Sequence, residues 1–198
     1  MIPLVLFLSC NKTEKNQEVI SFEELAGSTG SDSTAPSVVY TMPAGYTPEF
    51  ASFVSRELPA YDTIGHKKIH PMDRFGFSHS YKLDFKEKIP SNQPVETQGF
   101  SASVYYYTFS DTLKTKNAFY NWLDCFGKSC AEIKPGQSSE ELDALPSSAI
   151  VYDTTVIAIE YVCGQNGWKT FEDSVIANFG KKYRYRFNTT CTGSINWK

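Results

Sequence analysis

The order of strand-like and helix-like segments after residue 100 is the feature that most constrains the fold of this chain. Alternation with period two marks strands, and apolar residues that recur every three or four positions mark helices. The segments with these patterns are, in order, 101–109 (strand), 111–126 (helix), 149–152 and 156–163 (strands), 168–179 (helix) and 181–190 (strand). This is the order of the ferredoxin-like split βαβ motif. We therefore expect an α+β fold with an antiparallel sheet and two or three helices, in ferredoxin-like order from about residue 101 onward.

Two N-terminal additions precede this motif. Thr47-Pro48 is followed by apolar residues at helical spacing until Pro59, which predicts a short amphipathic helix. From residue 75 to 85 the odd positions are aromatic or apolar apart from His79, and the even positions are small or polar, which predicts a strand. If this strand forms a hairpin with its sequence neighbour 101–109, the sheet order is different and only the α+β class remains.

The composition indicates one globular domain and gives no electrostatic reason to bind nucleic acid. The chain has 198 residues, a formal net charge of -3 and a pI near 5.6, whereas nucleic-acid binding normally requires a concentrated basic surface. The twelve Tyr and fourteen Phe favour strands. We expect a single α+β domain over residues 38–198, which is long enough to bury a core of its own.

The first ten residues differ sharply from the polar stretch after them. Residues 1–9 carry no charge and end in a small residue, Cys10 comes next, and the chain then turns polar. A segment this short does not cross a bilayer core, which requires about 20 helical residues. The run Phe7-Leu8-Ser9-Cys10 resembles the end of a bacterial lipoprotein signal, where a small apolar box precedes the cysteine that is lipidated.

This resemblance implies a location and no particular activity. It implies a signal peptide at 1–9, a lipid on Cys10 and attachment to a membrane through that lipid alone. The protein would then lie in the bacterial cell envelope, either periplasmic or at the cell surface. Residues 10–37 are polar, and their second half is rich in Gly, Ser and Thr, which predicts a lipidated N-terminus followed by a flexible tether.

An even number of cysteines follows Cys10, and in an oxidising compartment this number favours two disulfides. The four are Cys125, Cys130, Cys163 and Cys191. Three pairings are possible, and we favour 125 with 130 and 163 with 191. The first two are close in sequence, the other two follow comparable strands, and the predicted topology places all four at one pole. Zinc is the alternative, although no spacing matches the Cys-x-x-Cys knuckle.

Motifs for common enzyme classes are absent from the sequence, and no cofactor is expected. The chain contains no Gly-x-Ser-x-Gly, His-Glu-x-x-His or Gly-x-Gly-x-x-Gly motif. The remaining candidates for a metal site or an acid–base pair are His66, His70, Asp73 and His79. Gly65 and Pro71 interrupt any continuous helix there, so the four-residue histidine spacing has no fixed geometry. For His79, which lies among aromatic residues of a predicted strand, a hydrogen-bonded core role is the alternative.

A second candidate site lies on the last predicted strand. If the helices cover the sheet face that takes Tyr183, Tyr185 and Phe187, the open face presents Arg184 and Arg186. Glu160, Tyr105 and Tyr107 would join them, and guanidinium groups beside aromatic rings suit carboxylates, sugars or protein loops. The alternative is a structural pair between Glu160 and an arginine across strands.

These observations lead to a first hypothesis and two alternatives. The first is a lipid-anchored envelope protein whose domain binds a ligand or an envelope protein without catalysis. The second is a small envelope hydrolase or metal-dependent enzyme that uses the region of His66, His70, Asp73 and His79. The third is an inhibitor or immunity-like lipoprotein that blocks an exported enzyme.

Overall fold

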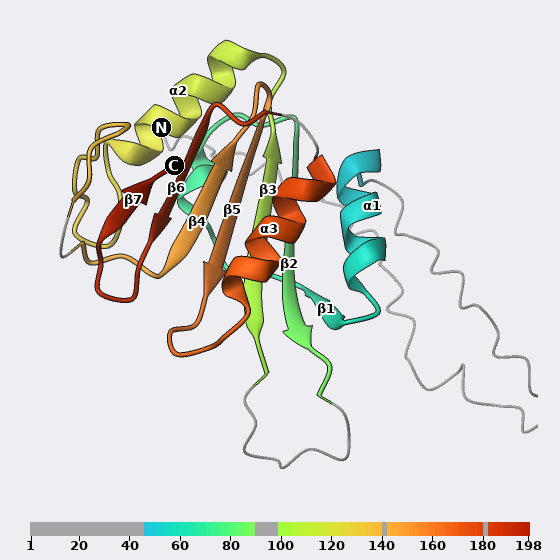
Figure 1. Cartoon of the computed structure of the whole chain (residues 1–198). Helices are drawn as coiled ribbons and strands as arrows, with labels where there is room; N and C mark the ends of the chain where they lie inside the picture. Colours follow the sequence, from blue (N-terminus) through green and yellow to red (C-terminus); the bar gives the residue numbers. More distant parts are fainter. Residues whose placement is uncertain (1–45, 90–98, 140–141, 180–181) are drawn as a thin grey trace, which may run out of the picture. The chain divides into compact units, whose positions relative to one another are not determined.

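Seven strands pair into one antiparallel sheet that organises the described part of the protein (Figure 1). The computed structural model describes residues 46–89, 99–139, 142–179 and 182–198, all within one compact unit, Tyr40–Lys198. The strands are β1 (Tyr61–Gly65), β2 (His79–Glu87), β3 (Ser101–Thr108), β4 (Ser147–Val151), β5 (Thr155–Tyr161), β6 (Tyr185–Thr189) and β7 (Ile195–Trp197). The helices are α1 (Pro48–Glu57), α2 (Thr112–Leu123), α3 (Trp168–Phe179) and the short 3-10 helix η2 (Pro71–Arg74).

The strand order confirms the α+β class but not the ferredoxin-like arrangement. The order is β1-β2-β3-β5-β4-β6-β7, and every neighbouring pair is antiparallel. In the ferredoxin-like order β6 would pair with β3. Here β2 takes that side of β3, and β6 pairs with β4 instead. β2 and β3 are neighbours in sequence, so the entropy cost of closing the loop between them is low. Their hairpin therefore places β2 on the side of β3 where the ferredoxin-like motif has its last strand.

The new position of β6 also moves a helix to the other face of the sheet. β3 and β4 run parallel with β5 between them, and β5 and β6 run parallel with β4 between them. The connections from β3 to β4 and from β5 to β6 each move two strand positions across the sheet in the same direction. However, the strands from which they start, β3 and β5, run in opposite directions. Because strand–helix–strand crossovers are right-handed, α2 and α3 must cover opposite faces.

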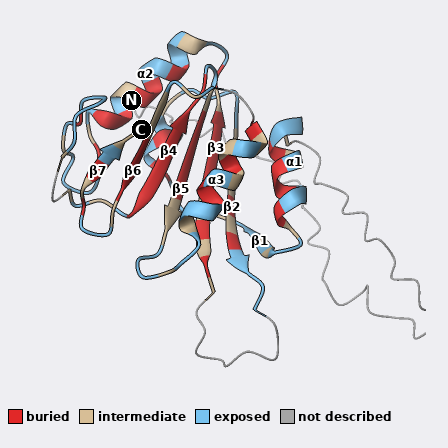
Figure 2. Cartoon of the chain, in the orientation of Figure 1, coloured by how far each residue is buried: buried red, intermediate tan, exposed pale blue. Residues whose placement is uncertain are grey.

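The protein therefore has a hydrophobic core on each side of its sheet. On one side α1 and α3 pack on Val104, Tyr106 and neighbouring residues of the same parity. On the other side α2 packs on Tyr105, Tyr107 and their neighbours. The central strands are accordingly buried on both faces (Figure 2). This arrangement explains why the sequence of β3 is aromatic on both faces.

Helices α1 and α2 begin where the sequence pattern predicts, but α2 ends at Leu123 rather than at residue 126. The side chain of Thr47 accepts the Phe50 N–H at the start of α1, and Asp111 accepts the Lys114 N–H at the start of α2. After α2, Gly127 adopts a φ of +71°, and a Cβ there would lie 2.7 Å from the carbonyl oxygen of Asp143. Only glycine fits that position without displacing the segment that leads into β4.

Both predicted cysteine pairs are at disulfide distance. The sulfurs of Cys125 and Cys130 are 1.98 Å apart, and those of Cys163 and Cys191 are 2.18 Å apart. Cys163 and Cys191 lie at the pole where β4 begins, because Glu160 and Thr189 both pair with Ser147 there. Cys125 and Cys130 lie at the same pole, because Gly127 between them lies against Asp143 in the segment before β4. The strand between β5 and β6 is β4, whereas the sequence pattern predicted β3 between them.

The N-terminal predictions lie outside the described residues. These are the signal peptide at 1–9, the lipidated Cys10, the tether at 10–37 and the domain boundary at residue 38. Within the part that the structure describes, no helix has both the length and the apolar character required to cross a membrane.

Candidate functional site

One sheet face carries polar side chains beneath the connection between β1 and β2. The even-numbered residues of β2 and the odd-numbered residues of β3 point to this side, and residues 66–75 cover them. Hydrogen bonds and ring contacts join the set that we call the polar network. Its members are His66, His70, Asp73, Lys82, Asp84, Ser103, Tyr105, Tyr107 and Glu160.

A chain of contacts runs through this network from β2 to β5. The Nδ1 atom of His66 lies 2.7 Å from Asp84 Oδ1, and its Nε2 atom lies 2.9 Å from the Tyr105 hydroxyl. That hydroxyl donates to Glu160 Oε2 at 3.1 Å, and Lys68 Nζ donates to the same oxygen at 3.1 Å. Ser103 donates to Asp84 at 2.6 Å.

Both ring nitrogens of His66 are engaged by neighbouring groups. The carboxylate of Asp84 meets Nδ1, and the Tyr105 hydroxyl meets Nε2. His66 is therefore held in place by β2 and β3, the strands that carry Asp84 and Tyr105.

Asp73 is the second centre of the network. It accepts from Lys82 Nζ at 2.5 Å, from the Tyr107 hydroxyl at 2.9 Å and from the His70 N–H at 2.9 Å. Partial burial acts to raise the pKa of Asp73, but these hydrogen bonds together outweigh it and hold the pKa below its usual value. Asp73 is therefore a charged, structural group that ties η2 to β2 and β3.

His70 is buried at the edge of the network with a neutral ring. It is 3% exposed, and its ring centroid lies 4.4 Å from that of Tyr105. Burial is the main cause that lowers its pKa to about 3, against the attraction of Asp73. Its Nδ1 atom accepts the Met72 N–H at 3.2 Å, so the proton of the neutral ring lies on Nε2.

The two network tyrosines are hydrogen-bond donors that do not ionise readily. Burial is the largest cause that raises the pKa of Tyr105, and the charge of Glu160 adds to it. Burial likewise raises the pKa of Tyr107, with a further contribution from its bond to Asp73. Neither hydroxyl is suited to act as a nucleophile at neutral pH.

A pocket of about 250 Å³ lies directly beside the network. It is bounded by the connection after β1, the end of α2, the segment before β4 and the sheet. Its apolar lining is Ile69, Pro71, Trp122, Phe126, Ala144, Leu145 and Ala158. Its polar lining is Lys68, His70, Lys128, Ser147 and Glu160. The volume suits one side chain or a ligand with a single ring, since pockets for drug-sized ligands measure roughly 300–1,000 Å³.

The disulfide at the end of α2 shapes one wall of this pocket. Phe126, Gly127 and Lys128 lie inside the loop that Cys125 and Cys130 close. Phe126 also pairs with Ala131 across the same loop. The disulfide therefore limits the positions that this wall can take.

A second hollow of about 380 Å³ adjoins the pocket and shares Lys68, Leu145 and Glu160 with it. Apolar side chains around the two hollows are exposed to solvent, namely Ile64, Ile69, Leu145 and Val162. The ion pair between Lys68 and Glu160 therefore stands where both hollows meet.

Several predicted site residues come together here. His66, His70 and Asp73 from the first candidate set join Tyr105, Tyr107 and Glu160 from the second. His79 does not, because it lies exposed at the start of β2, with Nδ1 3.3 Å from Thr108 Oγ1. Over the described residues, no group of three or more His, Cys, Asp or Glu side chains is placed to hold a metal ion.

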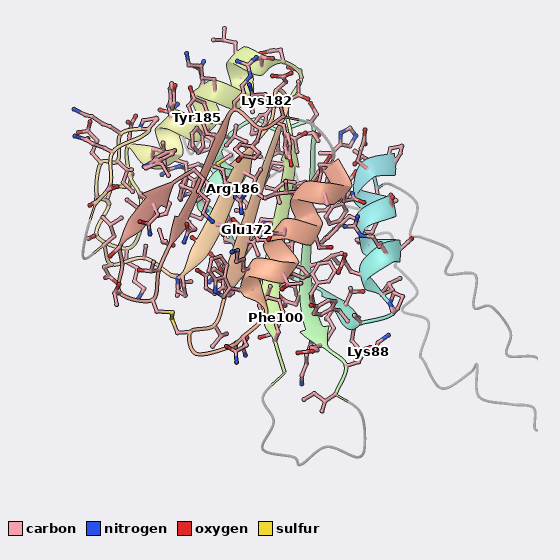
Figure 3. All side chains as sticks on the ribbon, in the orientation of Figure 1. Lys88, Phe100, Glu172, Lys182, Tyr185 and Arg186 are labelled. Atoms are coloured by element: carbon pink, nitrogen blue, oxygen red, sulfur yellow. A yellow bond between two sulfur atoms is a disulfide. The ribbon has the colours of Figure 1, made fainter. Side chains whose placement is uncertain are left out.

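The predicted grouping of the two arginines with Glu160 is wrong. Arg186 faces α3, where it forms an ion pair with Glu172 at 2.7 Å (Figure 3), and Glu160 points to the opposite face. Arg184 lies at the other end of the sheet from Glu160 and pairs with Asp153. The prediction assumed that both helices cover one face, whereas the position of β6 places α3 over the face that was expected to be open.

Sequence reasoning missed several members of the site. Lys82 and Asp84 belong to the polar side of the strand pattern at 75–85, which alone resembles a solvated face. Nothing in the sequence marked Lys68 or Trp122 as a pocket residue. Trp122 fits the apolar stripe of an ordinary helix. The sequence of β3 held a signal that could have located the site. A strand that is aromatic on both faces must be covered on both faces, so the polar side of the neighbouring strand β2 is covered as well.

Comparisons of the chain with protein-family models, with characterised proteins and with solved structures found no match.

Proposed function

We propose that this protein is a cell-envelope lipoprotein whose folded domain binds a small ligand, or one side chain of a partner protein, without catalysis. The observation that carries the proposal is the pocket of about 250 Å³ beside the polar network. Mostly apolar walls with a few fixed polar groups are typical of binding sites. Trp122 and Phe126 supply aromatic surface, and Glu160 supplies a fixed charge.

The protonation of the site supports binding rather than acid–base chemistry. His70 lines the pocket, but with a pKa of about 3 it stays neutral and exchanges no proton near neutral pH. The Asp84–His66 contact is the observation that favours the alternative, a small envelope hydrolase. However, both ring nitrogens of His66 already have partners, Asp84 and the Tyr105 hydroxyl, and His66 does not line the pocket.

The envelope location rests on the sequence and is consistent with the cysteines. The run that ends in Cys10 resembles a lipoprotein signal, and a lipid there would hold the domain at a membrane. Two cysteine pairs at disulfide distance fit a protein that folds in an oxidising compartment. The net charge of -3 is consistent with a ligand other than nucleic acid.

An NMR titration of the disulfide-bonded chain tests the binding proposal. Benzyl alcohol and indole are small enough for the pocket, and we expect them to shift the Trp122 indole signal and the Gly127 amide signal. Ala144→Leu fills the rim of the pocket and should abolish these shifts. Ala60→Leu makes the same change at an exposed position after α1, and it should leave them intact.

The alternatives predict other results. If neither probe shifts a signal from a pocket residue in the unmodified chain, the pocket is not a binding site and the proposal is wrong. If Ala60→Leu abolishes the shifts as effectively as Ala144→Leu, the probes do not bind in the pocket and the proposal is again wrong.

A further inference from the structure

Resting on the proposed function, we propose that the pocket recognises an organic cation, a primary amine or guanidinium on an apolar stem, and that the Lys68 ammonium occupies the position of that cation in the free protein. A lysine or arginine side chain of a partner protein, or a small free amine, has this chemistry. Glu160, Lys68 and the pocket walls each support this assignment.

Glu160 is a carboxylate held ready for a cation. Its side chain is 20% exposed, and its Oε2 atom accepts from the buried Tyr105 hydroxyl. His66 holds Tyr105 in turn, and Asp84 holds His66. The carboxylate is thus oriented by a chain of groups that does not involve Lys68. A cation that replaces Lys68 would meet an acceptor already in place, which reduces the ordering cost of binding.

The Lys68 ammonium is held only weakly at the cation position beside Glu160. Lys68 lies between β1 and η2, in a stretch without regular secondary structure, and its side chain is 52% exposed. Its ammonium group lies 3.1 Å from Glu160 Oε2. Exposed ion pairs of this kind contribute little to stability, so the ammonium can move into solvent when another cation binds. The pair stands at the junction of the two hollows, where a stem could enter from either side.

The walls suit a cation with an apolar stem better than an anion. Trp122 and Phe126 offer aromatic surface, which favours both methylene groups and cations. The other lysine of the pocket, Lys128, is 71% exposed and lies 3.5 Å from Asp143, so solvent screens most of its charge. An anion in the pocket would meet the charge of Glu160, and only the solvent-exposed ammonium groups of Lys68 and Lys128 would attract it.

Three probes that share one ring separate the possible ligand classes. Benzylamine is cationic at neutral pH, benzyl alcohol is neutral and benzoate is anionic. We expect benzylamine to bind at least about tenfold more tightly than benzyl alcohol, as read from the Trp122 and Gly127 NMR signals, because charge-assisted hydrogen bonds exceed neutral ones. Benzoate should bind more weakly than either.

Three variants locate the effect. Glu160→Gln keeps the shape of the side chain and should remove the preference for benzylamine, while benzyl alcohol still binds. Lys68→Met removes the internal competitor and should tighten benzylamine binding about two- to fivefold, the range for an exposed ion pair. Lys128→Met removes the other lysine and should leave the preference unchanged. An unchanged near-UV circular dichroism spectrum confirms that each variant is folded.

The outcomes distinguish this inference from the proposed function. Equal binding of benzylamine and benzyl alcohol, or tighter binding of benzoate, would leave the pocket as a binding site and overturn the cation assignment. A benzylamine preference that survives Glu160→Gln would overturn the role of Glu160. If no probe shifts a signal from a pocket residue, the proposed function fails as well.

Discussion

The hydroxyl of Tyr105 donates to Glu160 Oε2 at 3.1 Å and thereby links the interior of the sheet to the carboxylate of the pocket. Tyr105 is fully buried, and the same hydroxyl meets His66 Nε2 at 2.9 Å. The tyrosine therefore orients a pocket residue and stabilises the fold at the same time, which makes its hydroxyl the most informative group to remove.

We expect Tyr105→Phe to lower the free energy of unfolding by about 1–3 kcal/mol, because two partly buried groups lose a hydrogen-bond partner. Chemical denaturation measures this change. Tyr120→Phe is the matched control, since its hydroxyl meets only that of Tyr185 among the described residues, near the surface. A loss for Tyr105→Phe no larger than that of the control would contradict the role of the network.

His70 should make stability depend on pH in acid. Its pKa is lowered from 6.5 to about 3 in the folded protein, so below pH 6.5 the unfolded chain binds a proton that the folded chain does not. Stability should therefore fall between pH 6.5 and 3, by at most about 1.4 kcal/mol per pH unit from this group. His70→Asn can retain the N-cap of η2 and should flatten that part of the curve. A slope identical in both proteins would exclude His70 as its source.

Asp73 also makes stability depend on pH in acid. Comparing the wild type with His70→Asn removes this contribution, because both proteins contain Asp73. Its folded pKa is held below the usual value, so its stabilisation is lost as the pH falls through that lowered pKa. Lys82, Lys68 and His66 also act on His70 by charge. The difference between the wild-type and His70→Asn curves, rather than either curve alone, therefore reports on His70.

The two arginines that the sequence pattern placed together should differ in their effect on stability. Arg186 pairs with Glu172, whose side chain is only 1% exposed, so Arg186→Met should cost about 3–5 kcal/mol by leaving a buried carboxylate. Lys198 lies 3.6 Å from Glu172 and compensates part of this loss. Arg184→Met, at an exposed pair with Asp153, should cost less than about 1 kcal/mol. Equal losses in thermal unfolding would argue against the buried pair.

The disulfides should protect all four cysteines of the folded domain. Alkylation without reductant, followed by intact mass measurement, should leave Cys125, Cys130, Cys163 and Cys191 unmodified. Replacing both Cys163 and Cys191 by alanine should cost about 3–4 kcal/mol, since this bond spans 28 residues. The bond across five residues at Cys125 should contribute less, about 2 kcal/mol. Four alkylated thiols in the untreated protein would refute both bonds.

Cys10 should determine membrane attachment. We expect Cys10→Ala to abolish labelling by a fatty-acid probe and to move the protein from the membrane fraction to the soluble fraction, because the lipid is the proposed anchor. Ser9→Ala keeps a small residue before the cysteine, so labelling should persist. Membrane retention of the Cys10→Ala variant would mean that another part of the chain or a partner holds it there.

The local patterns were sufficient to predict most elements of the fold, because period and capping are properties of neighbouring residues. The alternation at 75–85 predicted β2, Thr47 and Asp111 mark the starts of α1 and α2, and the cysteine spacing favoured the pairs found. The α+β class followed from these elements, and the hairpin between β2 and β3 was already visible as the alternative to the ferredoxin-like order.

The tertiary structure alone decided which side chains meet. The ferredoxin-like order was wrong because β2 rather than β6 pairs with β3, and the handedness of the crossovers then placed α3 opposite α2. That single change sends Arg186 to Glu172 and leaves Glu160 with Tyr105, Lys68 and the pocket. A period of two tells which residues share a face, but only the strand order and the covering helices determine what that face contacts.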